Sequence, residues 1–346
     1  MTAPRKICLT GPTRLKVAED ILRAAGCELS LGKSADDFPK LRYERGELLR
    51  LIGDCDILYP AGRDTIGADI LDACANLQAV VKSSIGIESV DTDAATDLGI
   101  LCCNSPTPEN YLGVAEATLG LMVALFKRLK FNEACLRGGG WKAPQNRGAL
   151  MLGKTVGIIG VGRIGQNVAK RLGAWGMTIL GYDPYVAQET VSALGVKMVA
   201  LETLLRASDL VTLHVMLTRE TRGMIGLREL KMMKSSAFII NTSRGPAIGE
   251  KDLVQALNEK IIAAAALDVF DEEPLPSDSP LRQVDPSRLI LTPHIIGTNP
   301  GSAEAGQRMA AGSMLAILEG KAPDTVVNPQ AIPRWKERFW PSGRRG

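Results

Sequence analysis

Three glycines near the middle of the chain have the spacing that binds the phosphates of a dinucleotide. Gly160, Gly162 and Gly165 follow the apolar run 156–159, and a helical pattern continues after them. In such a turn the first glycine permits a tight bend, the second leaves room for a pyrophosphate, and the third lets the helix lie close to the strand. The pyrophosphate would meet free N–H groups at the positive end of the helix dipole. The order strand, glycine turn, helix is what this chemistry requires.

Asp183 adds a second part of the same candidate site. It follows the next apolar run, 177–182, roughly twenty residues beyond the glycines, where an acidic residue binds the ribose hydroxyls. A carboxylate there accepts hydrogen bonds from a ribose diol and repels a 2′-phosphate. Pro184 and Tyr185 come next, with no arginine to hold such a phosphate. The sequence therefore predicts NAD, and not NADP, as the cofactor.

The chain has two histidines, His214 and His294, so acid–base chemistry by an imidazole near neutral pH must use one of them. His214 falls at the end of an expected strand, where ligands bind at the switch point of a parallel sheet. It either lines the cofactor site or is a plain core histidine. The seven cysteines are scattered with no CxxC pair, which favours reduced thiols, a cytoplasmic protein and no metal site.

Length and composition limit the class of protein. A chain of 346 residues favours two domains over a single core. The 45% of hydrophobic residues, 23% of charged residues and net charge of +3 are ordinary for a globular protein and give no reason to expect nucleic acid as a partner. We expect no membrane span and no signal peptide, because the necessary apolar runs are missing from the sequence.

Short apolar runs alternate with helical patterns, which predicts parallel sheets with helices on both faces. In the first part the expected strands are 6–9, 28–31, 57–59, 77–82 and 100–102, and the expected helices are 13–25, 45–52, 68–75 and 91–98. Around the glycine turn the expected strands are 156–159, 177–182, 197–199, 210–214, 237–241, 263–269 and 289–291, with helices at 201–207, 227–232 and 251–259.

A polar stretch with two prolines, 104–110, marks a connection, and a long helix is expected at 111–129, followed by a loop with an aromatic anchor at 137–141. A further helix at 301–318 is expected to return to the first domain. The sequence thus predicts a doubly wound Rossmann domain at 105–297, inserted into a flavodoxin-like α/β substrate domain at 1–104 and 298–346. The basic, aromatic tail from residue 335 is expected to pack on the protein's own surface or on a subunit partner; contact with a membrane or nucleic acid is the alternative.

Several segments together resemble the D-isomer-specific 2-hydroxyacid dehydrogenase family. They are the glycine turn at 160–165, the strand end 239–245 with Asn-x-x-Arg-Gly, and the acidic run 267–275, which is followed by Pro293 and His294. The proline-containing hinge after residue 103 and the loop at 84–86 are similar too. The resemblance covers roughly residues 80–330, and the residues before it match in pattern alone.

The resemblance implies hydride transfer between NADH and a 2-oxo acid, whose reverse is the oxidation of a D-2-hydroxy acid. Arg244 would bind the substrate carboxylate through its planar guanidinium group. His294 would donate a proton to the ketone oxygen, and Glu273 would orient the imidazole and favour its protonated form. Asp271 and Glu272 are the alternatives to Glu273 as the partner of the histidine.

The binding residues that the resemblance implies come from the glycine turn, from strand ends and from the segment after His294. For the cofactor they are Gly160, Gly162, Arg163, Ile164, Gly165, Asp183, His214, Val215, Thr242, Ser243, Asp268 and Gly297. For the substrate they are Arg244 and the N–H groups of Ser84, Ile85 and Gly86, which would hold the carboxylate. No metal is expected. A homodimer is implied, with the helix from Tyr111 and the 137–141 loop at the interface.

Departures from the family pattern concern the substrate rather than the reaction. Met216 replaces a frequent proline, Ile295 is bulky beside the cofactor, and Glu109 would disfavour doubly anionic substrates if it faces the cleft. The 2-oxo acid is therefore left open, with reduction as the expected direction. The alternatives are an NAD(H)-sensing, corepressor-like binding protein on the same fold and the oxidation of phosphite or another inorganic anion. Glu273 speaks against formate oxidation, because the similar formate dehydrogenases have glutamine at that position.

Overall fold

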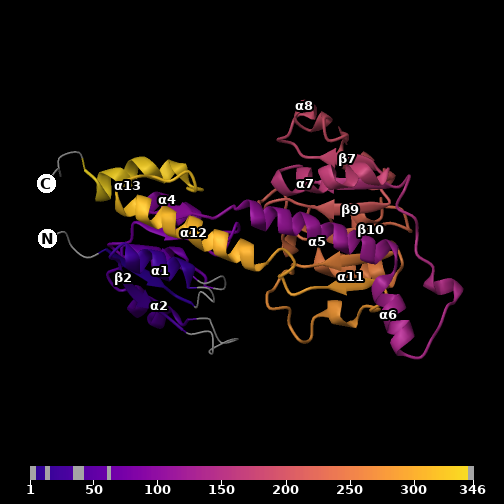
Figure 1. The fold of residues 1–346 in the computed structure, drawn as a ribbon, viewed down its shortest axis with the longest axis horizontal. Helices are drawn as coiled ribbons and strands as arrows, with labels where there is room; N and C mark the ends of the chain where they lie inside the picture. The colour runs from indigo at the N-terminus through magenta and orange to yellow at the C-terminus, as the bar shows by residue number, and fades with distance from the viewer. Residues whose placement is uncertain (1–4, 12–15, 34–42, 61–63, 342–346) are drawn as a thin grey trace. The chain divides into compact units, whose positions relative to one another are not determined.

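The computed structural model describes residues 5–11, 16–33, 43–60 and 64–341. The chain folds as two compact units, Met1–Asn110 with Asn299–Gly346, and Tyr111–Thr298. Each unit has its own parallel sheet with helices on both faces (Figure 1). The predicted α/β class is confirmed. None of the helices in the described ranges is long and apolar enough to cross a membrane.

The first unit contains a five-stranded sheet in the order β2-β1-β3-β4-β5, which is the flavodoxin-like order. Its strands are β1 (Lys6–Leu9), β2 (Glu28–Leu31), β3 (Ile57–Tyr59), β4 (Ala79–Val81) and β5 (Leu101–Cys103). One face is covered by α1 (Val17–Ala24), α12 (Pro300–Leu318) and α13 (Ile332–Phe339). The other is covered by α2 (Arg45–Ile52), α3 (Ala68–Ala73) and α4 (Thr92–Leu98).

The end of the chain packs on this same unit. Trp335 of α13 is fully buried in the core that α1 and α12 share. Trp340 donates from Nε1 to Gln78 Oε1 over 3.3 Å, and Arg338 donates to the Leu98 carbonyl over 2.7 Å. The expectation that the tail packs on the protein's own surface is confirmed up to residue 341. Residues 342–346, like residues 13–15 of the first expected helix, lie outside the described residues.

The second unit contains a seven-stranded parallel sheet in the order β12-β11-β10-β9-β6-β7-β8. Its strands are β6 (Thr155–Ile159), β7 (Thr178–Tyr182), β8 (Val196–Met198), β9 (Leu210–Leu213), β10 (Phe238–Asn241), β11 (Ala264–Leu267) and β12 (Leu289–Leu291). The strand order reverses between β6 and β9. In an open parallel sheet, the crevice outside the carboxyl ends of the strands at such a reversal is where ligands bind.

Helices cover both faces of this second sheet, as a doubly wound fold requires. In Figure 1, α5 (Pro108–Phe126) and α7 (Arg163–Leu172) lie in front of the sheet, and their apolar side chains share one core, to which α8 (Gln188–Ser192) contributes Val191. The other core is formed by α9 (Leu201–Ala207), α10 (Leu227–Leu230) and α11 (Glu250–Asn258). The sheet is therefore the middle layer between two layers of helices.

The region between the two prolines and the glycine turn differs from the expectation. The long helix begins at Pro108 instead of residue 111, because proline is favoured in the first turn, where no N–H is needed. It ends at Phe126, and after Arg128 with a φ of 52° a second helix follows, α6 (Leu129–Arg137). None of the α6 residues is buried, so the apolar side chains of this helix do not belong to the core of the second unit.

Candidate active site

The glycine turn follows β6 at the point where the strand order reverses. Gly160 has a φ of +88°, and a Cβ there would lie 2.6 Å from the carbonyl oxygen of His214. A Cβ at Gly165 would lie 2.2 Å from the carbonyl oxygen of Gly160, so α7 starts against the turn. At Gly162 a Cβ would meet no described atom within 4 Å. The turn is therefore tight and closely packed on one side, and open where a pyrophosphate would approach.

Asp183 contacts this turn directly. Its Oδ2 accepts a hydrogen bond of 2.9 Å from the N–H of Val161, and its Oδ1 accepts one of 2.9 Å from the N–H of Tyr185. Each carboxylate oxygen has a second lone-pair direction, which remains able to accept a ribose hydroxyl. The acid that follows β7 is thus fixed beside the turn that follows β6.

His214 lies at the end of β9, on the other side of β6. Burial lowers the pKa of its imidazole to about 3, so it is neutral at physiological pH and cannot be the proton donor of a reaction near neutrality. Its Nε2 is 3.1 Å from Thr212 Oγ1, whereas its buried Nδ1 has no hydrogen-bond partner among the described residues. A buried nitrogen of this kind is what a bound ligand can satisfy.

A second group of polar side chains lies after β10, β11 and β12. β10 ends at Asn241, whose Oδ1 accepts hydrogen bonds from the N–H and the hydroxyl of Ser243, 3.0 and 2.7 Å long. The Asn241 amide donates over 2.8 Å to the carbonyl of Arg244, and Arg244 Nη1 donates over 2.6 Å to the carbonyl of Ser243. A Cβ at Gly245 would lie 2.0 Å from the Phe270 carbonyl carbon. The arginine loop therefore touches the backbone of the next loop.

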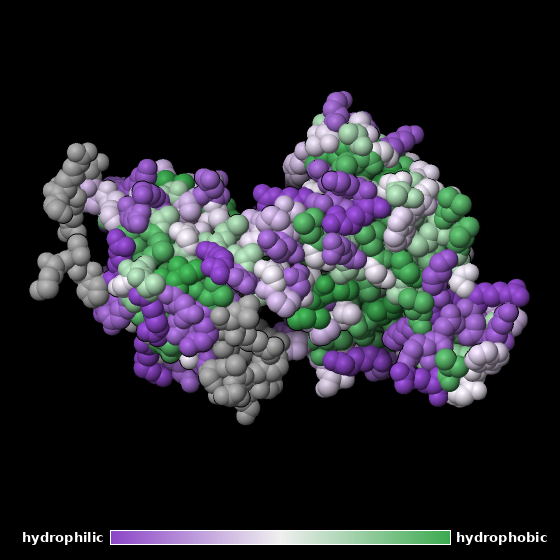
Figure 2. Space-filling view, viewed as in Figure 1, coloured by the Kyte–Doolittle hydropathy of each residue, from purple (hydrophilic) through white to green (hydrophobic). Residues whose placement is uncertain are grey.

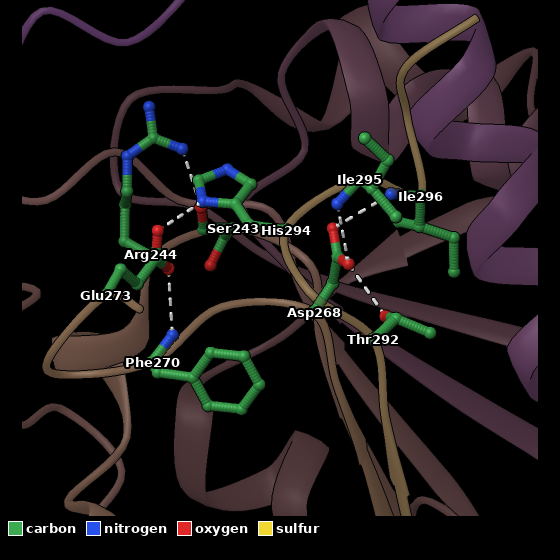
Figure 3. A network of polar contacts seen from close by, with 9 residues as sticks. All are labelled: Ser243, Arg244, Asp268, Phe270, Glu273, Thr292, His294, Ile295 and Ile296. Atoms are coloured by element: carbon green, nitrogen blue, oxygen red, sulfur yellow. Dashed lines mark hydrogen bonds and ion pairs between the residues drawn. The ribbon is translucent and has the colours of Figure 1, made fainter. Parts of the chain in front are cut away.

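That next loop brings Glu273 to His294. Glu273 Oε1 accepts a hydrogen bond of 3.1 Å from the N–H of Phe270, and Oε2 lies 2.6 Å from His294 Nδ1. Figure 3 shows the guanidinium of Arg244, the carboxylate of Glu273 and the imidazole of His294 gathered together, with His294 Nε2 directed away from the carboxylate. The acid beside the histidine is thus Glu273, and not Asp271 or Glu272.

The electrostatics of this group favour a protonated imidazole. The hydrogen bond to Glu273 raises the pKa of His294 above its usual value, against desolvation, and the charges of Glu273 and Asp268 add to the rise. Burial opposes ionisation of Glu273, but its hydrogen bond with His294 and the charges of His294 and Arg244 hold its pKa below the usual value. With Nδ1 bonded to Glu273, Nε2 is left to donate or accept a proton.

Asp268 holds the segment that carries His294. It is 3% exposed at the end of β11, and burial raises the pKa of its carboxyl. Its Oδ1 accepts from the Thr292 hydroxyl over 2.7 Å and from the Ile295 N–H over 3.1 Å, and its Oδ2 accepts from the Ile296 N–H over 3.3 Å (Figure 3). The backbone of His294 has a φ of +51°, which residues other than glycine rarely adopt.

Helix α5 supports two of these segments from behind. A Cβ at Gly297 would lie 2.3 Å from Val114 Cγ2, so the chain after His294 passes close to the helix. The hydroxyl of Thr242 lies 3.2 Å from that of Thr118. The candidate cofactor residues Thr242 and Gly297 are therefore placed by packing against α5.

The candidate substrate loop belongs to the first unit and follows β4. The Ser84 carbonyl accepts a hydrogen bond of 2.9 Å from the Ser105 N–H, and the Ile85 carbonyl accepts one of 2.8 Å from the Asn104 amide. The N–H groups of Ser84, Ile85 and Gly86 donate to none of the residues that the structure describes. The loop thus has fixed carbonyls and available donors, the arrangement that binds a carboxylate.

Comparisons with known proteins agree with this geometry. The family model of the D-isomer specific 2-hydroxyacid dehydrogenase NAD binding domain matches residues 119–296. A glyoxylate reductase of Thermofilum pendens is 38% identical over 314 residues, which are 88% of this chain and 90% of that protein. The chain belongs to this family.

Two further proteins extend the comparison. A D-3-phosphoglycerate dehydrogenase of Methanocaldococcus jannaschii is 39% identical over 291 residues, 84% of this chain, but the chain spans about half of that relative, 55% of its length. The crystal structure of a protein from Thermus thermophilus superimposes with a TM-score of 0.81 at 33% identity, covering 93% of this chain and 99% of that one. The comparisons therefore confirm the predicted family, its two-domain Rossmann fold and NAD as the cofactor. At the level of the family, they also confirm an NAD-dependent oxidoreductase.

The second unit fits this cofactor on its own geometry. The open space at Gly162, the Asp183 carboxylate at the turn and the buried Nδ1 of His214 lie on adjacent strand ends, where the two halves of a dinucleotide would bind. The remaining cofactor candidates follow β6, β9 and β10: Arg163, Ile164, Val215, Thr242 and Ser243. The described residues hold no group of three or more His, Cys, Asp or Glu side chains suited to a metal ion.

Two positioning residues were absent from the sequence-based predictions. Asn241 fixes the turn before Arg244, and Thr292 anchors the segment before His294. Asn241 was visible as the first residue of the Asn-x-x-Arg-Gly pattern, but no spacing rule connects Thr292 with an acid more than twenty residues earlier.

Proposed function

We propose that the protein is a D-2-hydroxyacid dehydrogenase that uses NADH to reduce a 2-oxo acid. The observation that supports this most directly is the 2.6 Å contact between His294 Nδ1 and Glu273 Oε2, beside a guanidinium whose charge acts on both residues. Reduction of a ketone needs a proton on oxygen as a hydride arrives on carbon. A carboxylate substrate also needs a cation nearby, and Arg244 is that cation.

In this proposal each residue has one task. Bound NADH supplies the hydride to C2 of the substrate. Arg244 pairs with the substrate carboxylate. The N–H groups of Ser84, Ile85 and Gly86 are the available carboxylate donors of the first unit. His294 donates a proton from Nε2 to the ketone oxygen, while Glu273 stabilises the imidazolium before the transfer. In the oxidative direction the neutral imidazole takes the proton back.

The cofactor and the substrate are assigned to different units. We assign NAD to the second unit and the substrate loop to the first. The predicted cofactor domain, 105–297, and substrate domain, 1–104 with 298–346, differ from these units by six residues at one boundary and by one residue at the other. The Asp183 carboxylate favours NAD over NADP, since it accepts ribose hydroxyls and repels a phosphate. Among the relatives, the glyoxylate reductase is matched over 90% of its length, so we propose a small 2-oxo acid as the substrate.

We further propose a homodimer whose interface includes the predicted helix from Tyr111 and the 137–141 loop, together with α6, which lies between them in the chain. No α6 residue is buried, and Leu129, Leu136 and the following Trp141 are all more than 45% exposed. Figure 2 shows apolar side chains at the surface of the second unit among the polar ones near α6. Large exposed apolar side chains around one helix are typical of an interface. Sedimentation of the chain with Leu136→Ser and Trp141→Ser should shift from dimer toward monomer.

All seven cysteines are free, in keeping with our proposal of a cytoplasmic location.

The test is NADH oxidation, followed by absorbance, with a panel of 2-oxo acids from glyoxylate to branched and aromatic acids, and with D-3-phosphoglycerate and NAD in the oxidative direction. His294→Ala should bind NADH normally and lose about 10²- to 10⁴-fold in kcat, which is the usual contribution of a general acid. Normal binding of NADH with no turnover of any acid would contradict the proposal and favour an NAD(H)-sensing protein.

A further inference from the structure

The side chain of Tyr185 connects two loops at the cofactor end of the second sheet. Its hydroxyl donates a hydrogen bond of 2.9 Å to Glu220 Oε2. Tyr185 follows β7 and Glu220 follows β9, and β6 is the strand between these two in the sheet. The hydrogen bond therefore joins the loops on either side of the strand that leads into the glycine turn.

Both ends of this contact are held by their own backbones. The N–H of Tyr185 donates to Asp183 Oδ1 over 2.9 Å. In the other loop the N–H of Glu220 donates to the Thr218 hydroxyl over 3.2 Å, and the Thr221 hydroxyl donates to the Met216 carbonyl over 2.6 Å. Side-chain hydrogen bonds of this kind fix a turn and hence the starting point of its side chains. The carboxylate of Glu220 is thus presented from an ordered loop.

The contact is exposed, which argues against a structural role. Tyr185 is 81% exposed, and polar pairs at such positions contribute little to the stability of a fold. The pair instead ties a second carboxylate, that of Glu220, to the residue whose N–H bonds the carboxylate of Asp183. The hydrogen bond and charge of Glu220 raise the pKa of Tyr185, and the charge of Asp183 raises it further, so both carboxylates act on one hydroxyl.

We propose that Glu220, positioned by Tyr185, is a second determinant of cofactor choice, which together with Asp183 disfavours the 2′-phosphate of NADPH. The inference rests on the proposed use of NADH at this site. A 2′-phosphate on a ribose held by Asp183 would bring its charge beside Asp183, and Tyr185 links Asp183 to Glu220. Because repulsion between charges in water falls slowly with distance, a carboxylate need not touch the phosphate to weaken its binding.

The experiment measures the Kd of NADH and of NADPH for the full chain, by fluorescence of the reduced nicotinamide, with Glu220→Gln, Tyr185→Phe and a control. Glu220→Gln should tighten NADPH binding about two- to fivefold at low salt, and leave NADH unchanged. High salt should remove most of this gain, because the repulsion is screened. Tyr185→Phe keeps the charge of Glu220 but removes the hydroxyl that holds its carboxylate. This variant should therefore also bind NADPH more tightly, but by a smaller factor than Glu220→Gln.

The control is Glu259→Gln, which removes the same charge from the same unit. Glu259 follows α11 and precedes β11, so it lies at the amino ends of the strands, away from the glycine turn. It should change neither Kd. Equal changes for NADH and NADPH in Glu220→Gln, or a gain that persists at high salt, would overturn the inference. Failure of the unaltered chain to bind NADH would contradict the proposed function instead, which separates the two failures.

Discussion

Replacing Gly245 by alanine tests whether the contact between two loops sets the geometry of the candidate catalytic group. A Cβ at this position would lie 2.0 Å from the carbonyl carbon of Phe270 and 2.1 Å from its oxygen, where ordinary contacts begin at 3.4 Å. Both partners are backbone, so no side chain can rotate away. The loops must therefore separate by about 1 Å or more, and Arg244 must move relative to Glu273.

The expected effect follows from that displacement. A misplacement of about 1 Å in a group that orients a substrate costs on the order of 10²-fold in rate. We therefore expect kcat/KM for the 2-oxo acid to fall about 10²-fold, equivalent to about 2.7 kcal/mol of transition-state stabilisation. NADH affinity should change less, because the glycine turn and Asp183 follow other strands and, of the cofactor candidates, Thr242 and Ser243 lie in the displaced loop. The strain should also destabilise the fold by about 1–3 kcal/mol.

Steady-state NADH oxidation, NADH titration and thermal unfolding measure these three quantities. Gly173→Ala is the matched control, because the same methyl group there would meet no described atom within 4 Å and the backbone is helical. It should keep its kcat/KM and gain up to about 1 kcal/mol of stability. If Gly245→Ala keeps the wild-type kcat/KM, the close loop contact does not control the position of Arg244, and the reasoning is refuted.

Three more predictions concern protonation and support of the histidine. Reduction needs the protonated imidazole, so kcat/KM should fall as pH rises through the raised pKa of His294. In Glu273→Gln the anion that raises this pKa is absent, so the fall should occur at lower pH. A pH–rate profile of both proteins measures the difference. His214→Asn should leave the position of that profile unchanged, because His214 has a pKa of about 3 and stays neutral; a shifted profile would contradict this assignment. Asp268→Ala should lower the free energy of unfolding, measured by urea titration, by about 2–4 kcal/mol. The substitution leaves the donors of residues 292, 295 and 296 without their acceptor. A smaller loss would mean that water replaces the carboxylate.

Most of the fold could be predicted because buried parallel strands are short, continuous apolar runs. The helix at 201–207 and the strand at 289–291 have the predicted bounds. The strand after the glycine turn, β7, starts at Thr178, one residue after the predicted start. α6 was not predicted: its nine residues have an amphipathic pattern, but it directly follows the expected long helix at 111–129, and none of its residues is buried. α8 is five residues long and gives too short a pattern.

The site was predictable as a set of residues but not as an arrangement. The sequence offered Asp271, Glu272 and Glu273 as partners for the histidine, and nothing in the spacing separates neighbouring acids. The structure separates them through the Phe270 N–H, which bonds Glu273 Oε1 and leaves Oε2 for His294. Likewise, the predicted cofactor residue Asp268 uses its carboxylate within the protein to hold the backbone around His294.

The left-handed backbone of His294 explains why that buried carboxylate is needed. A residue other than glycine with a φ of +51° costs on the order of 1–3 kcal/mol, and it persists only where its surroundings enforce it. Asp268 accepts one hydrogen bond from before the histidine and two from after it, each worth about 1.5–3 kcal/mol when the acceptor is charged. These bonds more than offset the strain. The backbone that carries the candidate proton-donating imidazole is therefore held by an acid that makes no hydrogen bond to the ring.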